Sequence, residues 1–222
     1  MVGDPLEEIH TFTQAVARGE VSCDVETCLR CGGRPISFCR HDARKRIFLV
    51  ILDRLVHEVL SLLLRWKCPL CKKTFTTYPV FALPWKRYVR KEVLRFSERY
   101  VTEDQSSYRK SATEGGLAIF YDGSDAAKID DRQFAHTTIH RWFPFLGSLK
   151  RTARDALRLI REKTPGSGIF RKILPVPPWK YRSEERREVL FGSRQLLQVE
   201  SEFRALFASS LFPRFATACR WR

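Results

Sequence analysis

The chain has 222 residues, of which 44% are hydrophobic, and a formal net charge of +15. This composition is sufficient to build cores for one ordinary domain or two small ones, and it excludes an intrinsically disordered chain. A positive charge of this size favours a polyanionic partner, and we expect nucleic acid rather than an acidic membrane surface.

The charge is unevenly distributed. Residues 1–27 carry a net charge of −5, residues 28–100 carry +12, residues 101–140 carry −3 and residues 141–222 carry +11. Two basic blocks therefore flank an acidic middle. Because tracts of this length include solvated helix faces, we expect the blocks as wholes, rather than every basic residue, to face a polyanion.

Neither the N-terminus nor the most apolar stretch of the sequence indicates a membrane protein. Residues 1–8 have no positive region followed by an apolar run, which does not fit a secretory signal. The most apolar stretch, residues 47–64, is interrupted by Asp53, Arg54, His57 and Glu58 and is too charged to span a bilayer. The chain has seven cysteines, an odd number, which does not indicate a disulfide framework. We predict a soluble cytoplasmic protein without a membrane partner or a small-molecule substrate.

Residues 1–27 are expected to form a separate acidic segment. Residues 5–19 predict a short helix, with Ile9, Phe12 and Val16 on one stripe and Gly19 as its stop. Because its negative charge would repel DNA, we expect this helix to contact a basic part of the protein or another protein.

Two cysteine pairs carry the strongest chemical signal. They are Cys28 and Cys31, and Cys68 and Cys71. Thiolates two residues apart can clamp one edge of an ion, and two such pairs supply the closed tetrahedral shell of a structural zinc site. We predict one structural Zn²⁺. The alternatives are an incidental buried pair, redox-active cysteines, or Cys39 or His41 in place of one ligand.

Residues 28–80 are predicted to form a zinc ribbon. The 36 residues between the pairs must leave the metal site and return to it, which favours strands at 47–52 and 59–66, followed by a strand near 72–78. The same apolar positions also match the spacing of one amphipathic helix, and this alternative stays open.

Residues 81–147 are predicted to form a helical domain with a helix-turn-helix-like unit. Helices are expected at residues 85–100 and 106–112, and a turn at residues 135–136 precedes a recognition segment. In that segment Ile139 and Trp142 would pack inward. The outward residues would be Thr137, Thr138, His140 and Arg141. An ordinary amphipathic helix is the alternative.

Residues 148–222 are predicted to form a basic helical C-terminal region, with helices at about 146–162 and 183–209. The fold class predicted for the whole chain is α+β, with a small N-terminal β zinc ribbon followed by a mainly α-helical region.

Further basic side chains are candidates for nucleic-acid contacts. They are Lys72, Lys73, Lys86, Arg87 and Arg90. The lysines beside the second cysteine pair, with Arg30 and Arg34 beside the first, would also reduce the electrostatic cost of a tetrathiolate site.

The order of these motifs resembles a known family. The Cys-x-x-Cys pairs, Arg40-His41, the stretches 67–75 and 81–88, and Thr138-Ile-His-Arg-Trp142 are similar to the zinc-ribbon plus helix-turn-helix proteins encoded in bacterial transposable elements. The similarity covers residues 28–146. It implies double-stranded DNA binding within transposition or recombination machinery, at the bacterial nucleoid, with a transposase or recombinase as partner.

No catalytic centre is predicted. A transposase nuclease needs three carboxylates on a ribonuclease-H-like sheet. The candidates are not set on recognisable strands; they are Asp53, Asp122, Asp125, Asp130 and Glu162. We therefore expect a non-catalytic DNA-binding component. The alternatives are a protein-interaction adaptor on a larger nucleic-acid enzyme, or an RNA-binding protein that stacks bases on Trp85, Tyr88 and Trp142.

Overall fold

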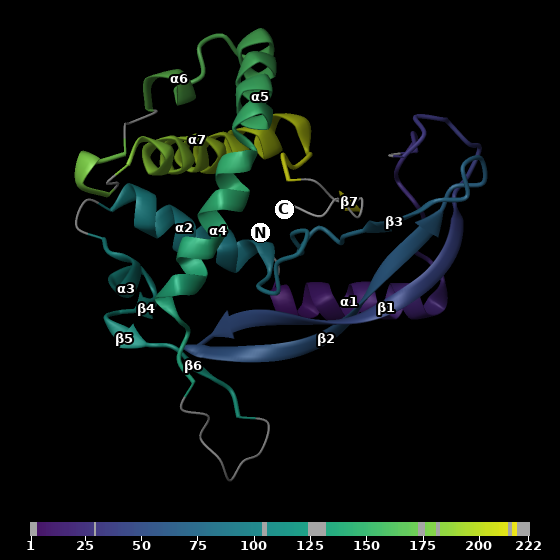
Figure 1. Ribbon diagram of the computed structural model, residues 1–222, viewed down its shortest axis with the longest axis horizontal. Helices are drawn as coiled ribbons and strands as arrows, with labels where there is room; N and C mark the ends of the chain where they lie inside the picture. The colour runs from purple at the N-terminus through teal and green to yellow at the C-terminus, as the bar shows by residue number, and fades with distance from the viewer. Residues whose placement is uncertain are drawn as a thin grey trace. The chain divides into compact units, whose positions relative to one another are not determined.

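The computed structural model describes residues 4–28, 30–103, 106–123, 132–172, 176–180, 183–212 and 215–216. The fold is mixed α+β, in agreement with the predicted class at this level (Figure 1). The chain divides into two compact units: unit 1 contains residues 1–92 and 213–222, and unit 2 contains residues 93–212. This division is coarser than the four segments expected from the sequence, whose boundaries at residues 27, 80 and 147 stay predictions.

The acidic helix predicted at the start of unit 1 is confirmed as α1 (Pro5–Arg18). The Asp4 carboxylate accepts a hydrogen bond from the Leu6 N–H (3.0 Å), with Pro5 at the first helical position. Gly19 ends the helix with a φ of 76°, a left-handed conformation that glycine adopts without strain. Ile9 and Val16 are fully buried, as their spacing predicts.

The long apolar region forms two strands, β1 (Cys39–Leu52) and β2 (Leu55–Lys67), and not a helix. They pair antiparallel from Leu52 opposite Leu55 to Cys39 opposite Lys67, and the register shifts between Arg40 and Asp42. The turn between them uses Asp53 and Arg54, both at positive φ (47° and 63°). The prediction of paired strands is therefore confirmed.

Two shorter strands extend the sheet of unit 1. β3 (Thr74–Thr77) pairs antiparallel with β2, beginning at Thr74 opposite Lys67. β7 (Phe215–Ala216) pairs antiparallel with β3, so the order in this unit is β1-β2-β3-β7. Residues 68–73 thus form the loop of a β2–β3 hairpin.

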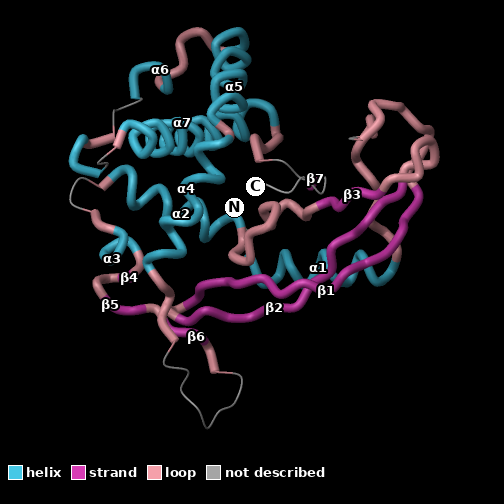
Figure 2. Tube along the Cα trace, viewed as in Figure 1, coloured by secondary structure: helices cyan, strands magenta, loops and turns pink. Residues whose placement is uncertain are grey.

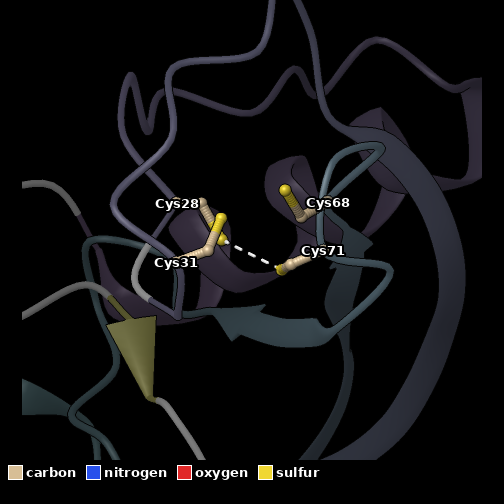
Figure 3. Close-up of side chains that lie close together, drawn as sticks. All are labelled: Cys28, Cys31, Cys68 and Cys71. Carbon is tan, nitrogen blue, oxygen red and sulfur yellow. Dashed lines mark hydrogen bonds between the residues drawn. The ribbon is translucent and has the colours of Figure 1, made fainter.

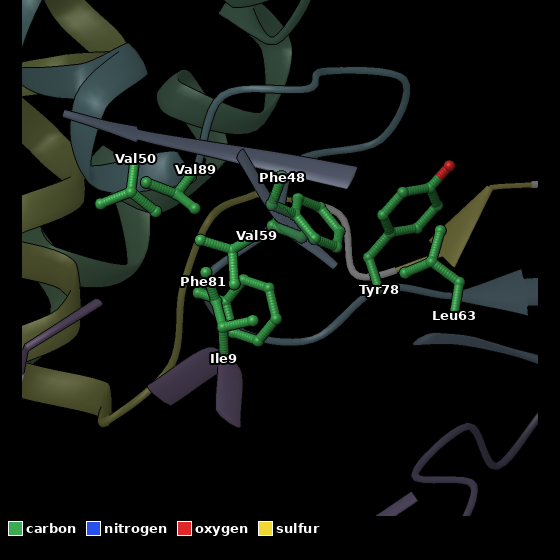
Figure 4. Close-up of a cluster of buried hydrophobic side chains, with 9 residues drawn as sticks. Ile9, Phe48, Val50, Val59, Leu63, Tyr78, Phe81 and Val89 are labelled. Carbon is green, nitrogen blue, oxygen red and sulfur yellow. The ribbon is translucent and has the colours of Figure 1, made fainter. Parts of the chain in front are cut away.

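Two buried clusters hold unit 1 together. The first contains Ile9, Phe48, Val50, Val59, Leu63, Tyr78, Phe81, Ala82 and Val89 (Figure 4). The second contains Val16, Cys28, Phe38, Leu64, Trp66, Cys68 and Phe75. Because α1 contributes Ile9 to the first cluster and Val16 to the second, this helix packs along the hairpin and joins the two clusters (Figure 1).

The helix predicted at residues 85–100 begins five residues later. Residues 87–89 pair with β1 instead: the Leu49 N–H donates to the Arg87 carbonyl (2.9 Å) and the Val89 N–H donates to the Leu49 carbonyl (3.1 Å). Trp85 has a φ of 62°, which is incompatible with a right-handed helix. The helix is α2 (Arg90–Thr102), whose first three residues belong to unit 1.

Unit 2 is mainly helical (Figure 2). Its further elements are α3 (Tyr108–Ser111), β4 (Thr113–Glu114), β5 (Leu117–Ala118), β6 (Phe120–Tyr121), α4 (His136–Ser148), α5 (Lys150–Lys163), α6 (Ile169–Lys172), a 3₁₀ helix (Pro178–Lys180) and α7 (Glu184–Phe207). The predicted helices at 106–112 and 183–209 correspond to α3 and α7, and Ser183 caps α7.

The helix predicted at residues 146–162 is wrong in its start. Residues 146–148 belong to α4, which continues past Pro144, and α5 begins only after Leu149. Gly147 explains this arrangement: a Cβ there would lie 3.0 Å from the Val189 carbonyl of α7. Close packing against α7 therefore stabilises the last turn of α4 despite the hydrogen bond that proline removes.

A buried lysine closes the end of α2 within unit 2. The Lys180 ammonium donates to the carbonyl oxygens of Tyr100 and Glu103, the second at 2.7 Å. A cation is favourable at a helix C-terminus, where carbonyl groups lack helical partners. Within the part of the chain that the structure describes, no helix is both long and apolar enough to cross a membrane.

Candidate metal centre

Four sulfur atoms from two separated loops converge in unit 1. They belong to Cys28, Cys31, Cys68 and Cys71 (Figure 3). All four lie within 4.8 Å of one another, and the sulfurs of Cys28 and Cys71 are 3.8 Å apart. A tetrahedron with metal–sulfur bonds of about 2.3 Å has edges of about 3.8 Å. The sequence prediction that these four cysteines come together to hold a metal ion is confirmed at the level of geometry.

The two loops share the same backbone hydrogen bonds, and we call them knuckle 1 (residues 28–33, without a description of Leu29) and knuckle 2 (residues 68–73). In each, the N–H of the first cysteine donates to the carbonyl of the sixth residue, at 2.8 and 2.9 Å. The N–H of the fifth residue donates to the carbonyl of the first cysteine, at 2.9 Å in both. The fifth residue is left-handed in both, Gly32 at φ 69° and Lys72 at φ 61°. This shared turn aims both thiols of each pair at one point.

The sheet fixes the knuckles relative to each other. Knuckle 2 is closed by the β2–β3 pair, and knuckle 1 leads to the start of β1 through Phe38, whose ring packs edge-on against Phe75 at 5.0 Å. Cys28 and Cys68 are buried in the second core cluster, whereas Cys31 is exposed. One side of the cluster is therefore dry and packed, and the other faces solvent.

Neighbouring groups shift the pKa values of the Cys28 and Cys31 thiols in opposite directions. Burial raises the pKa of the Cys28 thiol, but hydrogen bonds from the backbone N–H groups of Arg30 and Cys31 and from nearby thiols outweigh it and bring that pKa to about 7. The Gly33 N–H lowers the pKa of Cys31, but burial and the other thiols raise it to about 11. Of these two thiols, Cys28 therefore loses its proton more readily, and the thiolate is the form that a metal ion binds.

Neither additional ligand considered from the sequence joins the four sulfurs. Among the described residues, the group of metal-ligand atoms contains the four cysteines without Cys39 or His41. His41 lies where the β1 register shifts, and both side chains are exposed.

The basic candidates near the knuckles are exposed. Lys72 and Lys73 follow the last cysteine of knuckle 2, and Arg30 and Arg34 belong to or follow knuckle 1. Positive charge this close offsets the formal −2 charge of a metal bound to four thiolates.

The next three candidates differ in their exposure to solvent. Arg87 is exposed, Lys86 is half-buried, and burial lowers the pKa of Lys86. Arg90 is buried at 8% exposure, which does not suit a phosphate contact. All three lie at or before the start of α2, so the helix predicted at residues 85–100 does not include Lys86 and Arg87.

In unit 2, α4 has the two faces expected of it. Ile139 and Trp142 are buried, whereas Thr137, His140 and Arg141 are exposed. Thr138 is half-buried. The helix-turn-helix unit itself is not confirmed: the described residues just before α4 are extended, with Gln133 bridged to Phe120. Residues 124–131, which include the carboxylate candidates Asp125 and Asp130, lie outside the described residues.

The aromatic residues proposed to stack on RNA bases are mostly inaccessible. Tyr88 and Trp142 are 5% and 3% exposed, and Trp85 is exposed at 45%. Only one of the three could meet a base without rearrangement of the core.

Sequence reasoning missed two arginines near knuckle 2, Arg44 on β1 and Arg65 on β2. Both lie in a basic pocket with Lys73. Strand alternation is the signal that could have found them, since it places residues of known register on one face.

Comparisons of the chain with protein-family models, curated proteins and solved structures give no match.

Proposed function

We propose that this chain is a zinc-stabilised, non-catalytic protein that binds double-stranded DNA within a bacterial transposition or recombination system. Its place would be the cytoplasm, at the nucleoid. The observation that carries the proposal is the pair of matching cysteine knuckles flanked by exposed basic side chains. The resemblance to zinc-ribbon plus helix-turn-helix proteins of transposable elements supplies the setting and stays a prediction.

Zinc is the metal that best suits this ligand set. Four soft thiolates in a closed shell favour zinc or iron, and zinc has no preferred geometry to resist a tetrahedral site. With all four positions taken by sulfur, the ion would hold the knuckles together and leave no position for a substrate.

DNA is the favoured polyanion because both units present cations to solvent. Residues 28–100 carry a net charge of +12, and the exposed face of α4 offers Arg141 beside Thr137 and His140. Arginine binds guanine or phosphate, and threonine donates to phosphate, while the buried Ile139 and Trp142 keep the helix on its scaffold.

The proposal is tested by selecting bound sequences from a random duplex pool with the full chain loaded with metal, in the presence of single-stranded RNA as competitor. We expect enrichment of a duplex sequence and one zinc per chain by elemental analysis. Enrichment of no duplex, or preferential binding of the RNA, would overturn DNA binding. Iron in place of zinc would overturn the metal assignment.

Arg141→Gln gives the matched test on the selected duplex, with Arg154→Gln on α5 as control. Both arginines are exposed and both changes remove one positive charge. A base-reading arginine contributes about 1–3 kcal/mol of discrimination. We expect Arg141→Gln to relax sequence preference and Arg154→Gln to leave it unchanged. Equal effects of the two variants would refute the role of α4 in recognition.

A protein-interaction adaptor is the second candidate, favoured by a groove on unit 1. The groove has a volume of about 540 Å³; it is lined by Asp4, Glu7, Glu8, Thr11, Phe12, Ala15, Pro79, Val80 and Phe81. Its apolar floor and acidic rim suit a basic amphipathic segment of a partner protein. Glu7→Gln with Glu8→Gln should weaken recruitment of the transposase or recombinase without changing affinity for duplex DNA.

A further inference from the structure

We infer that unit 1 contains a phosphate-binding pocket beside the metal centre, which exists only when the two knuckles are held together. The pocket has a volume of about 240 Å³; its lining residues are Arg30, Arg44, Arg65, Lys73, Thr74, Phe75 and Thr76. Four cationic side chains and two hydroxyl groups thus surround one small space. Pockets for drug-sized ligands measure about 300–1,000 Å³, so this one suits a single small anion.

The sheet register explains why the strand residues converge. Asp42 on β1 lies opposite Arg65 on β2, which lies opposite Thr76 on β3. Because residues two apart in a strand point to the same face, Arg44 and Thr74 share that face. The pocket is therefore built on three adjacent strands.

Arg65 is preorganised for an anion. Its guanidinium donates to the Asp42 carboxylate (3.1 Å) and to the Thr74 hydroxyl (2.8 Å), and its side chain is 20% exposed. Asp42 also lies 3.6 Å from Arg44. This carboxylate offsets one of the four positive charges, which leaves a net charge of about +3 facing the pocket at neutral pH.

Within the described part of the chain, two of the four cations have no partner that would compete with an anion. The side chains of Arg30 and Lys73 make no hydrogen bond or ion pair with any described residue. Arginine and lysine are the usual phosphate-binding side chains, and threonine hydroxyls add donors. A phosphate group is the anion whose charge and acceptor oxygens use all of these donors.

The metal centre controls the geometry of the pocket. Arg30 lies between the two cysteines of knuckle 1, and Lys73 is the last residue of knuckle 2. Lys73 directly precedes Thr74 and stays beside β3, whereas Arg30 reaches the pocket from the other knuckle, so we expect metal loss to let Arg30 move away from the strand residues. That the phosphate belongs to the DNA backbone rests on the proposed function, whereas the pocket itself does not.

Salt dependence of duplex binding distinguishes one shared phosphate from two separate contacts. Each neutralised phosphate contributes about −0.9 to the slope of log K against log salt, which is about a 3.5-fold loss of affinity between 50 and 200 mM. If Arg44 and Lys73 hold the same phosphate, Arg44→Gln, Lys73→Gln and the double variant should each reduce the slope by no more than about 0.9. The shared pocket would be overturned if the two single reductions added up to about 1.8 in the double variant. It would also be overturned if none of the variants changed the slope.

Arg54→Gln is the matched control, because Arg54 is exposed in the turn at the opposite end of the β1–β2 hairpin from the knuckles. It removes the same charge as Arg44→Gln, and its slope should equal that of the unmodified chain. One metal ion per chain and an unchanged unfolding midpoint in every variant confirm that the fold is intact.

Inorganic phosphate separates failure of the pocket from failure of DNA binding. Titrated into the full metal-loaded chain, it should shift the amide resonances of Thr74 and Thr76, and the double variant or removal of the metal should abolish the shift. Phosphate binding at these residues without any binding of duplex DNA would keep the pocket and overturn the proposed function. DNA binding without a phosphate response at these residues would overturn the pocket and keep the proposed function.

Discussion

Replacing Gly32 by alanine is expected to weaken the metal site through the backbone alone. Gly32 has a φ of 69°, and a Cβ added there would meet no atom of the described residues within 4 Å. The cost is therefore that of a left-handed L-residue, about 1–2 kcal/mol. The lower entropy of unfolded alanine offsets about 0.4–1 kcal/mol of this. A net loss near 1 kcal/mol corresponds to about a fivefold increase in the metal dissociation constant, because metal binding and folding of the knuckle are coupled.

Knuckle 2 supplies the reverse experiment. Lys72 occupies the position equivalent to Gly32, at φ 61°, so Lys72→Gly should relieve the same backbone strain. Lys73→Gly removes an identical side chain at the next residue, which is not at positive φ. Both variants lose one charge and gain the same chain entropy in the unfolded state. The difference between their free energies of metal binding therefore isolates the cost of holding a non-glycine residue in the left-handed conformation. That cost is about 1–2 kcal/mol, or about 5- to 30-fold in the metal dissociation constant.

The measurement is competition between the metal-loaded full chain and a chelator of known affinity, at one fixed pH because metal binding releases protons. We expect Gly32→Ala to lose metal more readily than the unmodified chain, and Lys72→Gly to retain it better than Lys73→Gly. Equal dissociation constants for Lys72→Gly and Lys73→Gly would refute the equivalence of the two knuckles, as would an unchanged constant for Gly32→Ala.

Three further substitutions test the metal centre and the core of unit 2. Cys71→Ser should abolish stoichiometric zinc binding and accelerate hydrogen exchange at the knuckle amides, and retention of one tightly bound zinc would contradict a four-cysteine site. Trp142→Ala should lower the free energy of unfolding by about 3–5 kcal/mol, whereas Arg141→Gln should change it by less than about 0.5 kcal/mol, as measured by denaturant titration. Glu200→Ala should cost about 1.5–3 kcal/mol in the same titration, because the buried Glu200 carboxylate accepts the Leu211 N–H at 2.8 Å; a cost below about 0.5 kcal/mol would show that another group replaces it.

The metal centre was predictable because its signal is local. Two thiols separated by two residues define each knuckle without any tertiary information, and the return of the chain from Cys31 to Cys68 favoured a hairpin. Local periodicity alone did not decide between strand and helix at residues 47–66. The turn residues added little, since Asp53 and Arg54 adopt positive φ without the Asn-Gly or Asp-Gly pattern typical of such turns.

Features that depend on packing were not predictable in this way. Pro144 normally ends a helix, but α4 continues because Gly147 lets its last turn approach Val189 closely. Arg44 and Arg65 are separated by 20 residues and become neighbours only through the β1–β2 register. Each looks like an isolated charge in the sequence, and three paired strands are needed to show the pocket.

Because β7 pairs with β3, unit 1 is built from two separate segments of the chain, and unit 2 is inserted between them in the sequence. The chain leaves unit 1 within α2 and comes back to it at residue 213, where Phe215 and Ala216 pair with Thr77 and Thr76. A fragment that ends at residue 92 would therefore keep all four cysteines but expose the outer backbone edge of β3, which is a template for association with another strand. Self-association of such a fragment would indicate that the sheet has lost a strand, and a fragment that also includes β7 would keep this edge of β3 paired.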